Sequence, residues 1–170
     1  MTALEITQLS TSSLYGEFGR YFRIEEWYSP AAVEKYRHLG VNFFWSRIDR
    51  RLIETMLWIR VNKNQKIRVN NWLWGGRFTQ RGVRDSSTPM MKSRATKGDA
   101  WLSAHPLSMG VDYDVDGETA VEHREWLVSV ADQLPYPIRL ERNYGGTPIS
   151  WVHLDVCDDP KNPKVYLFDI

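Results

Sequence analysis

The sequence predicts a single α+β domain in which helices come first and an antiparallel sheet flanked by helices follows. Three observations support this class. Residues 47–61 have the periodicity of an amphipathic helix, segments of alternating apolar and polar residues gather after residue 109, and 170 residues suit one domain with one core. We therefore expect one small domain over residues 21–170 with a central antiparallel sheet, preceded by a polar N-terminal arm over residues 1–20.

The first half of the chain is expected to be mainly helical. Residues 22–24 are predicted to form a short strand, and Ser29-Pro30 is a favoured helix opening for a short helix over residues 31–38. The next helix, over residues 47–61, has apolar side chains at every third or fourth position. The residues of this stripe are Ile48, Leu52, Met56 and Ile59.

The second half of the chain is expected to contain most of the sheet. Residues 66–70 alternate and predict a first strand, whereas the irregular segment 72–101 predicts a long functional loop. Residues 110–115 predict the next strand, and residues 118–134 predict a helix ended by prolines. The three remaining predicted strands are residues 138–142, 151–156 and 165–168.

Composition excludes several classes of protein. A net charge of +1 gives no field for non-specific nucleic-acid binding, and Cys157 is the only cysteine, so no intrachain disulfide can form. No signal-peptide pattern occupies residues 1–16, and no apolar run is long enough to span a membrane. We expect synthesis in a reducing cytoplasm, without membrane insertion. Of the four histidines, His38 and His123 lie in polar helical segments and are expected to be exposed.

Two predicted strands carry apolar residues on one face and metal-binding side chains on the other. Asp112 and Asp114 share the polar face of the first strand, and His153 and Asp155 share that of the second. His105 precedes the first strand by a few residues. If the strands are neighbours, two imidazoles and a carboxylate meet, which is a sufficient ligand set for a catalytic zinc ion with a fourth position for water.

The spacing of these residues resembles that of the M15 metallopeptidases, which are zinc D-Ala-D-Ala carboxypeptidases and phage endolysins. The matching residues are Ser103-Ala104-His105, Asp112 seven residues later, and Trp151-Val152-His153 on a distant strand. The resemblance covers roughly residues 22–156 and implies the small α+β fold shared with the hedgehog signalling domain. It also implies that His105, Asp112 and His153 are the zinc ligands.

The resemblance implies further roles around the metal. Arg84 most resembles the arginine that binds the substrate carboxylate, and Ser103 matches the serine beside the first ligand. Trp72, Trp74 and Trp101 would be walls of a substrate cleft. The substrate class implied is the stem peptide of peptidoglycan.

Ser150 departs from the family pattern. Many members have Glu or Asp three residues before the last histidine ligand, as the general base, and a serine hydroxyl cannot act as that base at neutral pH. Asp155 and Asp114 are the candidate replacements for this base. Asp155 could also orient His153 as a hydrogen-bond partner.

Two functions follow from these observations. The first is a zinc-dependent peptidase that cleaves peptidoglycan stem peptides, as a phage endolysin or a virion-associated hydrolase. It would be made in the host cytoplasm and would act at the bacterial cell wall or be carried in a virion. The second is a catalytically impaired protein of the M15 fold that acts as a virion structural component, in contact with other virion proteins, or as a peptidoglycan-binding component. Ser150 favours the second function, and the ligand set favours the first.

Overall fold

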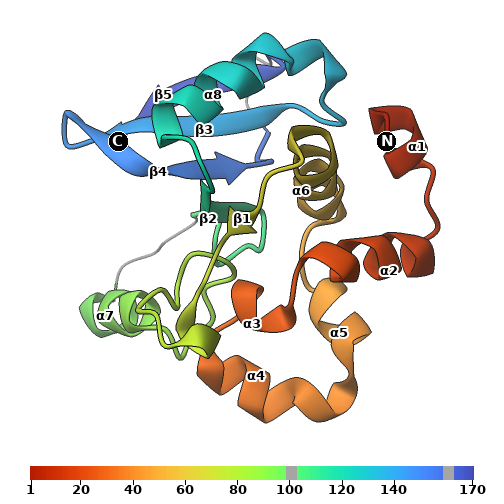
Figure 1. Cartoon of the computed structure of the whole chain (residues 1–170). Helices are drawn as coiled ribbons and strands as arrows, with labels where there is room; N and C mark the ends of the chain where they lie inside the picture. The colour runs from red at the N-terminus through yellow and green to blue at the C-terminus, as the bar shows by residue number, and fades with distance from the viewer. Residues whose placement is uncertain (99–102, 159–162) are drawn as a thin grey trace.

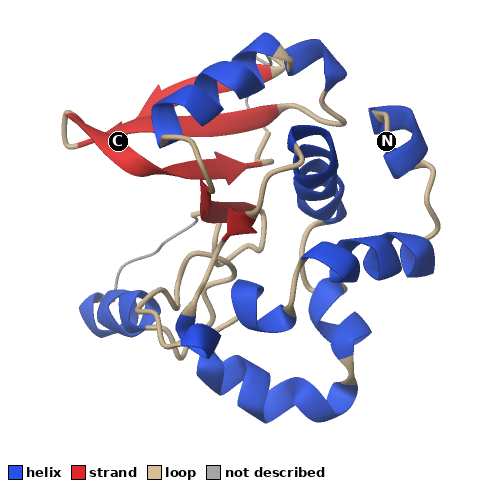
Figure 2. Ribbon diagram, in the orientation of Figure 1, coloured by secondary structure: helices blue, strands red, loops and turns tan. Residues whose placement is uncertain are grey.

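Helices make up most of the chain before residue 64 and strands dominate after residue 109, as Figures 1 and 2 show. The computed structural model describes residues 1–98, 103–158 and 163–170. Its α-helices are α1 (Ala3–Thr7), α2 (Thr11–Tyr21), α3 (Ile24–Trp27), α4 (Pro30–Tyr36), α5 (Val41–Trp45), α6 (Arg50–Lys63), α7 (Pro89–Lys97) and α8 (Ala120–Ser129). Its 3-10 helices are η1 (Arg37–Leu39), η2 (Trp72–Trp74) and η3 (Ala131–Gln133). Its strands are β1 (Ile67–Arg68), β2 (Gly110–Val115), β3 (Ile138–Tyr144), β4 (Thr147–Asp155) and β5 (Val165–Asp169). The predicted α+β class is confirmed.

The strands form one sheet in the order β1-β2-β4-β3-β5. The pairs β1–β2, β2–β4 and β3–β4 are antiparallel, as predicted, but β5 runs parallel to β3. β4 ends beside the start of β3, with Asp155 opposite Arg139, and β5 begins at the same end, with Val165 opposite Ile138. Because β5 starts at the same end of the sheet as β3, the two strands run in the same direction. The prediction of an antiparallel sheet is therefore wrong for β5.

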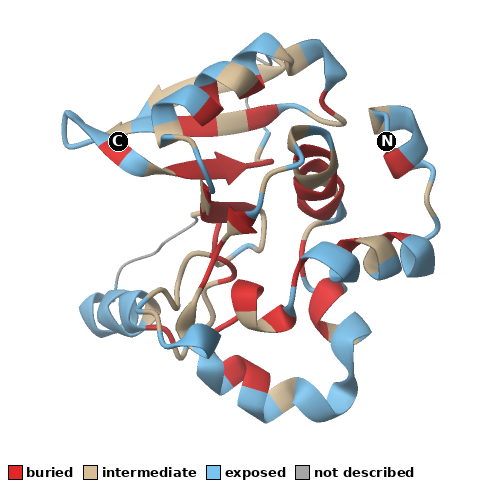
Figure 3. Cartoon of the chain, in the orientation of Figure 1, coloured by how far each residue is buried: buried red, intermediate tan, exposed pale blue. Residues whose placement is uncertain are grey.

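One face of the sheet contributes its side chains to the hydrophobic core. The side chains of this face that are buried almost completely include Val111, Tyr113, Ile138, Leu140, Val152 and Leu154. α8 packs against β2 and β4, and Trp126 of α8 stacks on Trp58 of α6 with 6.0 Å between ring centroids. Figure 3 shows buried residues along the strands and α6, and exposed residues on the outer helices. The opposite face of the sheet is left to the polar side chains of β2, β3 and β4.

The first twenty residues, expected to form a polar arm, are helical and contribute to the core. Three apolar side chains of α1 and α2 are completely buried: Ile6, Leu14 and Phe18. The polar residues that suggested an arm include helix caps, because the hydroxyls of Thr2 and Ser10 accept backbone hydrogen bonds at the starts of α1 and α2. Residues 22–24, predicted as a strand, lead into α3 instead.

The strongest local predictions are confirmed. The helix predicted over residues 47–61 is observed as α6, with Asp49 as its N-cap, and the strand predicted over residues 110–115 is β2 with the same bounds. The segment 72–101 is less irregular than predicted, since it contains η2 and α7. Among the described residues, no helix combines the length and the apolar character needed to cross a membrane.

His123 is completely buried, so the prediction that it is exposed is wrong, whereas His38 is exposed as expected. Nε2 of His123 lies 3.0 Å from the hydroxyl of Tyr113, and its Nδ1 is hydrogen-bonded to Glu118. Glu118 also pairs with Lys63 at 2.6 Å. His123 thus belongs to a buried network beneath α8, although its neighbours Glu122 and Glu125 are exposed.

Candidate metal centre

The polar face of the sheet carries Asp112 on β2 and His153 on β4. The antiparallel register pairs these two residues directly, which brings their side chains together on one face. His105 reaches the same point from the turn that precedes β2. The structure therefore brings together the three predicted metal ligands, and all three are buried.

The hydrogen bonds of the two imidazoles indicate which ring nitrogens carry protons. Nδ1 of His105 donates to the carbonyl oxygen of Gly82 at 2.8 Å, because a carbonyl only accepts. Nε2 of His153 lies 3.2 Å from Oδ2 of Asp155, and an ionised carboxylate also only accepts. In the neutral rings, Nε2 of His105 and Nδ1 of His153 then direct lone pairs towards Oδ1 of Asp112. Three lone pairs that converge on one point are stabilised by a cation between them.

Two of the three distances between the converging atoms match the spacing of a tetrahedral metal site, and the third is shorter. Nε2 of His105 lies 3.2 Å from Oδ1 of Asp112 and 3.2 Å from Nδ1 of His153, and these last two atoms are 2.8 Å apart. Ligands about 2.0–2.1 Å from a tetrahedral zinc ion are roughly 3.3 Å from one another. The three side chains therefore fit a divalent ion that takes nitrogen and oxygen ligands.

The electrostatics of the trio favour a positive charge at this point. Burial alone would lower the pKa of His153, but its hydrogen bonds to Asp112 and Asp155 raise that pKa to about 9. Burial lowers the pKa of His105. Burial opposes the ionisation of Asp112, but the two histidines hold its pKa well below the usual range. A proton on His153 and a metal ion therefore compete for the same position.

Asp155 supports His153 from the side opposite the metal position. Its carboxylate accepts hydrogen bonds from Arg139 at 2.8 and 3.1 Å and from the backbone nitrogen of Cys157 at 3.0 Å. Together with the contact to His153, these bonds engage both oxygens of a side chain that is almost completely buried. The geometry matches the predicted orienting role and leaves neither oxygen free to act as a base.

Arg84 lies against the carboxylate ligand. Its guanidinium donates to Oδ2 of Asp112 at 2.8 Å and, through Nε, to the carbonyl oxygen of Gln80 at 2.8 Å. Burial lowers the pKa of this guanidinium, while the charge of Asp112 opposes that shift. Arg84 therefore holds the oxygen of Asp112 that faces away from the histidines. If Arg84 bound a substrate carboxylate, as predicted, it would have to use the same guanidinium that already contacts Asp112.

Two glycines allow the backbone to approach closely enough to place His105. A Cβ atom on Gly82 would lie 2.3 Å from the carbonyl oxygen of Trp27, and one on Gly110 would lie 2.6 Å from Cβ of Ala104. Real Cβ atoms do not come this close to a neighbour. The close approach at Gly82 positions the carbonyl oxygen that accepts a hydrogen bond from His105. The close approach at Gly110 lets the turn that contains His105 pack against β2.

Other predicted residues lie beside the trio without joining it. Asp114 is on the same face as Asp112, but its carboxylate is paired with Arg81. Ser103 is half-buried, and its hydroxyl has no hydrogen-bond partner in the described part of the chain. Ser150 is exposed near the middle of β4. None of these side chains is therefore both free and acidic.

The predicted tryptophan walls are not assembled around the metal centre. Trp72 is packed against α3, and its indole nitrogen donates to the carbonyl oxygen of Tyr28 at 3.0 Å. Trp74 is 58% exposed and lines a separate pocket. Trp101 lies outside the described residues. Trp72 is thus mainly a packing residue.

Glu141 on β3 is a site residue that the sequence did not single out. It is the partner of His153 in the β3–β4 ladder, so Asp112, His153 and Glu141 form a row across three strands. Its side chain is mostly buried, burial raises its pKa, and it makes no hydrogen bond or ion pair with the described residues. The sequence signal was an acidic residue on the polar face of a strand, but the strand order was needed to place it beside His153.

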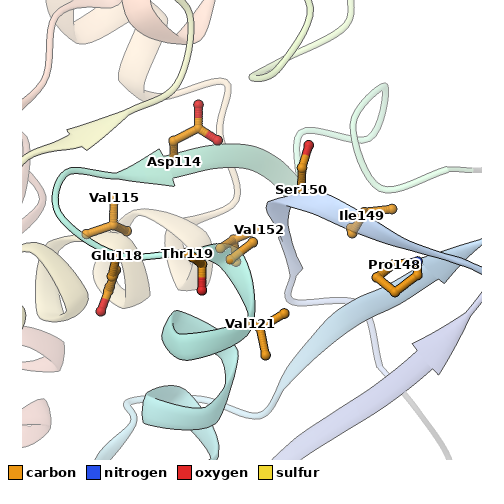
Figure 4. Close-up of a pocket in the computed structure, with 10 residues that line it drawn as sticks. Asp114, Val115, Glu118, Thr119, Val121, Pro148, Ile149, Ser150 and Val152 are labelled. Atoms are coloured by element: carbon orange, nitrogen blue, oxygen red, sulfur yellow. The ribbon is translucent and has the colours of Figure 1, made fainter.

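A cavity of about 450 Å³ lies where β2 turns towards α8. Asp114 of β2 and Ser150 of β4 line it together with apolar residues such as Val121 and Pro148 (Figure 4). The three ligands themselves do not line this cavity. The cavity and the candidate metal centre thus share strand β2, on which Asp114 lies two residues from Asp112.

In comparisons with known proteins, no family model matches the chain, and neither a curated protein nor a solved structure matches it significantly.

Proposed function

We propose that the protein is a zinc-dependent peptidase that cleaves peptidoglycan stem peptides, as a phage endolysin or a virion-associated cell-wall hydrolase. The observation that carries the proposal is the convergence of lone pairs from His105, Asp112 and His153 on one buried point. Two imidazoles and a carboxylate form a ligand set that catalytic zinc uses. The resemblance of these positions to the M15 metallopeptidases supplies the substrate class.

The residues around the metal position have separable roles. Zinc, when bound, acts as a Lewis acid on a scissile carbonyl and makes a nearby water molecule more acidic. Glu141 would accept a proton from that water and return it to the leaving amine, because Asp155 and Asp114 are engaged by arginines. Burial raises the pKa of Glu141, which makes its carboxylate a stronger proton acceptor. Arg84 keeps the carboxylate ligand Asp112 in position.

The experiment that tests the proposal measures free amino groups released from purified peptidoglycan. Zinc-loaded protein should release them, and both a chelator and the variant His153→Ala should abolish the release. His38→Ala, which changes an exposed histidine, is the matched control and should keep full activity. Elemental analysis should find about one zinc ion per chain, absent from His153→Ala. Zinc-loaded protein that releases no amino groups from walls of several compositions would overturn the peptidase.

A second function, a catalytically impaired component that binds peptidoglycan or other virion proteins, is supported by Ser150. This exposed serine stands where the M15 pattern has its acidic base. Under this function the protein would still bind zinc through the same ligands. It would sediment with intact cell walls or bind virion proteins. It would release no amino groups from the cell walls. Release of amino groups would exclude this alternative.

A further inference from the structure

A second pocket, separate from the metal centre, opens between the end of α2, α6 and β1 and has a volume of about 450 Å³. Four cationic side chains line it: Arg20, Arg23, Arg60 and Lys66. Glu26 is the carboxylate among its lining residues. The pocket therefore concentrates positive charge in a chain whose cationic and acidic residues are nearly balanced overall, at 22 and 21.

The positive charges of the pocket are largely uncompensated. Arg23, Arg60 and Lys66 have no acidic side chain at ion-pair distance among the described residues, whereas Arg20 pairs with Glu17 at 3.1 Å. The guanidinium of Arg60 lies over the ring of Tyr21, 4.9 Å from its centroid, which fixes its position. Like charges held close together repel one another, so an anion bound between them would be stabilised.

Glu26 offsets only part of this charge, because it is one carboxylate among four cationic side chains. Its carboxylate is buried and accepts a hydrogen bond from the backbone nitrogen of Arg23 at 2.8 Å. Burial raises the pKa of Glu26, which disfavours its negative form, although the charge of Lys66 acts in the opposite direction. The cationic ends of the surrounding side chains remain available to a ligand.

Trp74 adds an aromatic surface at the same pocket. Its side chain is 58% exposed, which is unusual for a residue that contributes a large apolar area when it packs. Arginine guanidinium groups bind phosphate oxygens through paired hydrogen bonds, and a lysine adds a point charge. We propose that this pocket binds the phosphate group of a polyol or sugar phosphate. Arg23, Arg60 and Lys66 bind the phosphate oxygens, and Trp74 packs against the attached carbon skeleton.

Isothermal titration calorimetry with glycerol 3-phosphate tests this assignment. The double variant Arg60→Gln/Lys66→Gln should lower the affinity at least about tenfold, since two charge-assisted contacts are lost. Lys35→Gln/Lys92→Gln removes the same charge from exposed positions outside the pocket and should bind as the unaltered protein does. Trp74→Ala should weaken glycerol 3-phosphate binding while inorganic phosphate binding stays unchanged.

Two further titrations identify the source of the phosphate. A glycerol phosphate oligomer that binds more tightly than glycerol 3-phosphate would indicate a segment of an anionic polymer, and equal affinities would indicate a small phosphorylated ligand. Both outcomes support a phosphate site. Equal affinity for acetate and phosphate, binding that is unaffected by Arg60→Gln/Lys66→Gln, or no saturable binding would overturn it. Zinc content and peptidase activity play no part in these measurements, so the outcome is independent of the metal centre.

Discussion

Glu141 and His153 face each other across the β3–β4 ladder. Asp112 pairs with His153 from the other side, on β2. Phe168 of β5 lies opposite Glu141, and its ring meets that of His153 edge-on with 6.1 Å between centroids. The order of the strands therefore sets the order of the side chains along one row: the carboxylate of Asp112, the imidazole of His153, the carboxylate of Glu141 and the ring of Phe168.

Replacement of Glu141 by Gln should lower the rate of amino-group release about 10²–10⁴-fold, the usual contribution of a general base, because an amide cannot accept the proton of the attacking water. Zinc content should stay the same, since Glu141 is not one of the converging ligands. Glu125→Gln, on the exposed side of α8, is the matched control and should keep the full rate. A Glu141→Gln protein with an unchanged rate would show that a different group serves as base.

Asp155→Asn should weaken zinc binding about 10–100-fold, the usual effect of losing a hydrogen-bond partner of a histidine ligand. The amide is neutral, so it no longer supports the basicity of His153 through Nε2. Competition with a chromophoric chelator measures the affinity. Asp169→Asn changes an exposed carboxylate of β5 and should bind zinc normally. Equal affinities of the two variants would argue against the supporting role of Asp155.

Gly110→Ala should lower the free energy of unfolding by about 1–3 kcal/mol, because the new methyl group would overlap Cβ of Ala104 and force the turn away from β2. Gly16→Ala makes the same chemical change inside α2, where a Cβ atom meets nothing within 4 Å. This control should be stabilised by about 0.5–1 kcal/mol. Urea unfolding of both variants checks the prediction, and equal midpoints would contradict the close contact.

The buried His123 should make stability depend on pH. Burial lowers its pKa to about 4, although its bond to Glu118 acts in the opposite direction. The unfolded state, with a pKa of about 6.5, therefore takes up the proton first as the pH falls, and stability decreases between about pH 6.5 and 4. The full loss from this residue is about 3 kcal/mol.

Urea unfolding at several pH values compares the unaltered protein with His123→Gln. In the variant, the free energy of unfolding should decrease less steeply between about pH 6.5 and 4, whatever its absolute value. His38→Gln, at an exposed position, should keep the slope of the unaltered protein. Identical slopes for His123→Gln and the unaltered protein would refute the assignment.

The grouping of His105, Asp112 and His153 as candidate ligands was predictable because the alternation along two strands showed which of their side chains share a face. In β2 and β4 an aliphatic face is buried, so the alternation along each strand determines which side chains lie opposite. That rule placed Asp112 and His153 on polar faces, and the observed register then pairs them.

The remaining site contacts depend on features that no short segment encodes. The position of Glu141 beside His153 follows from β3 lying between β4 and β5, and the direction of β5 follows from the path taken after β4. The ion pair between Arg84 and Asp112 joins residues 28 positions apart. The serines and threonines of the N-terminal segment are equally compatible with an arm or with helix caps, and only the burial of apolar residues such as Leu14 distinguishes the two.

The two imidazoles of the metal centre are separated by 48 residues along the chain. An ion held between them would act as a removable cross-link, closing a loop that contains β2, α8 and β3. A chain with a single cysteine has no internal disulfide to do this. Withdrawal of the ion would therefore remove the stabilisation that its binding gives to the folded chain and weaken the association between the turn at His105 and the late strand β4.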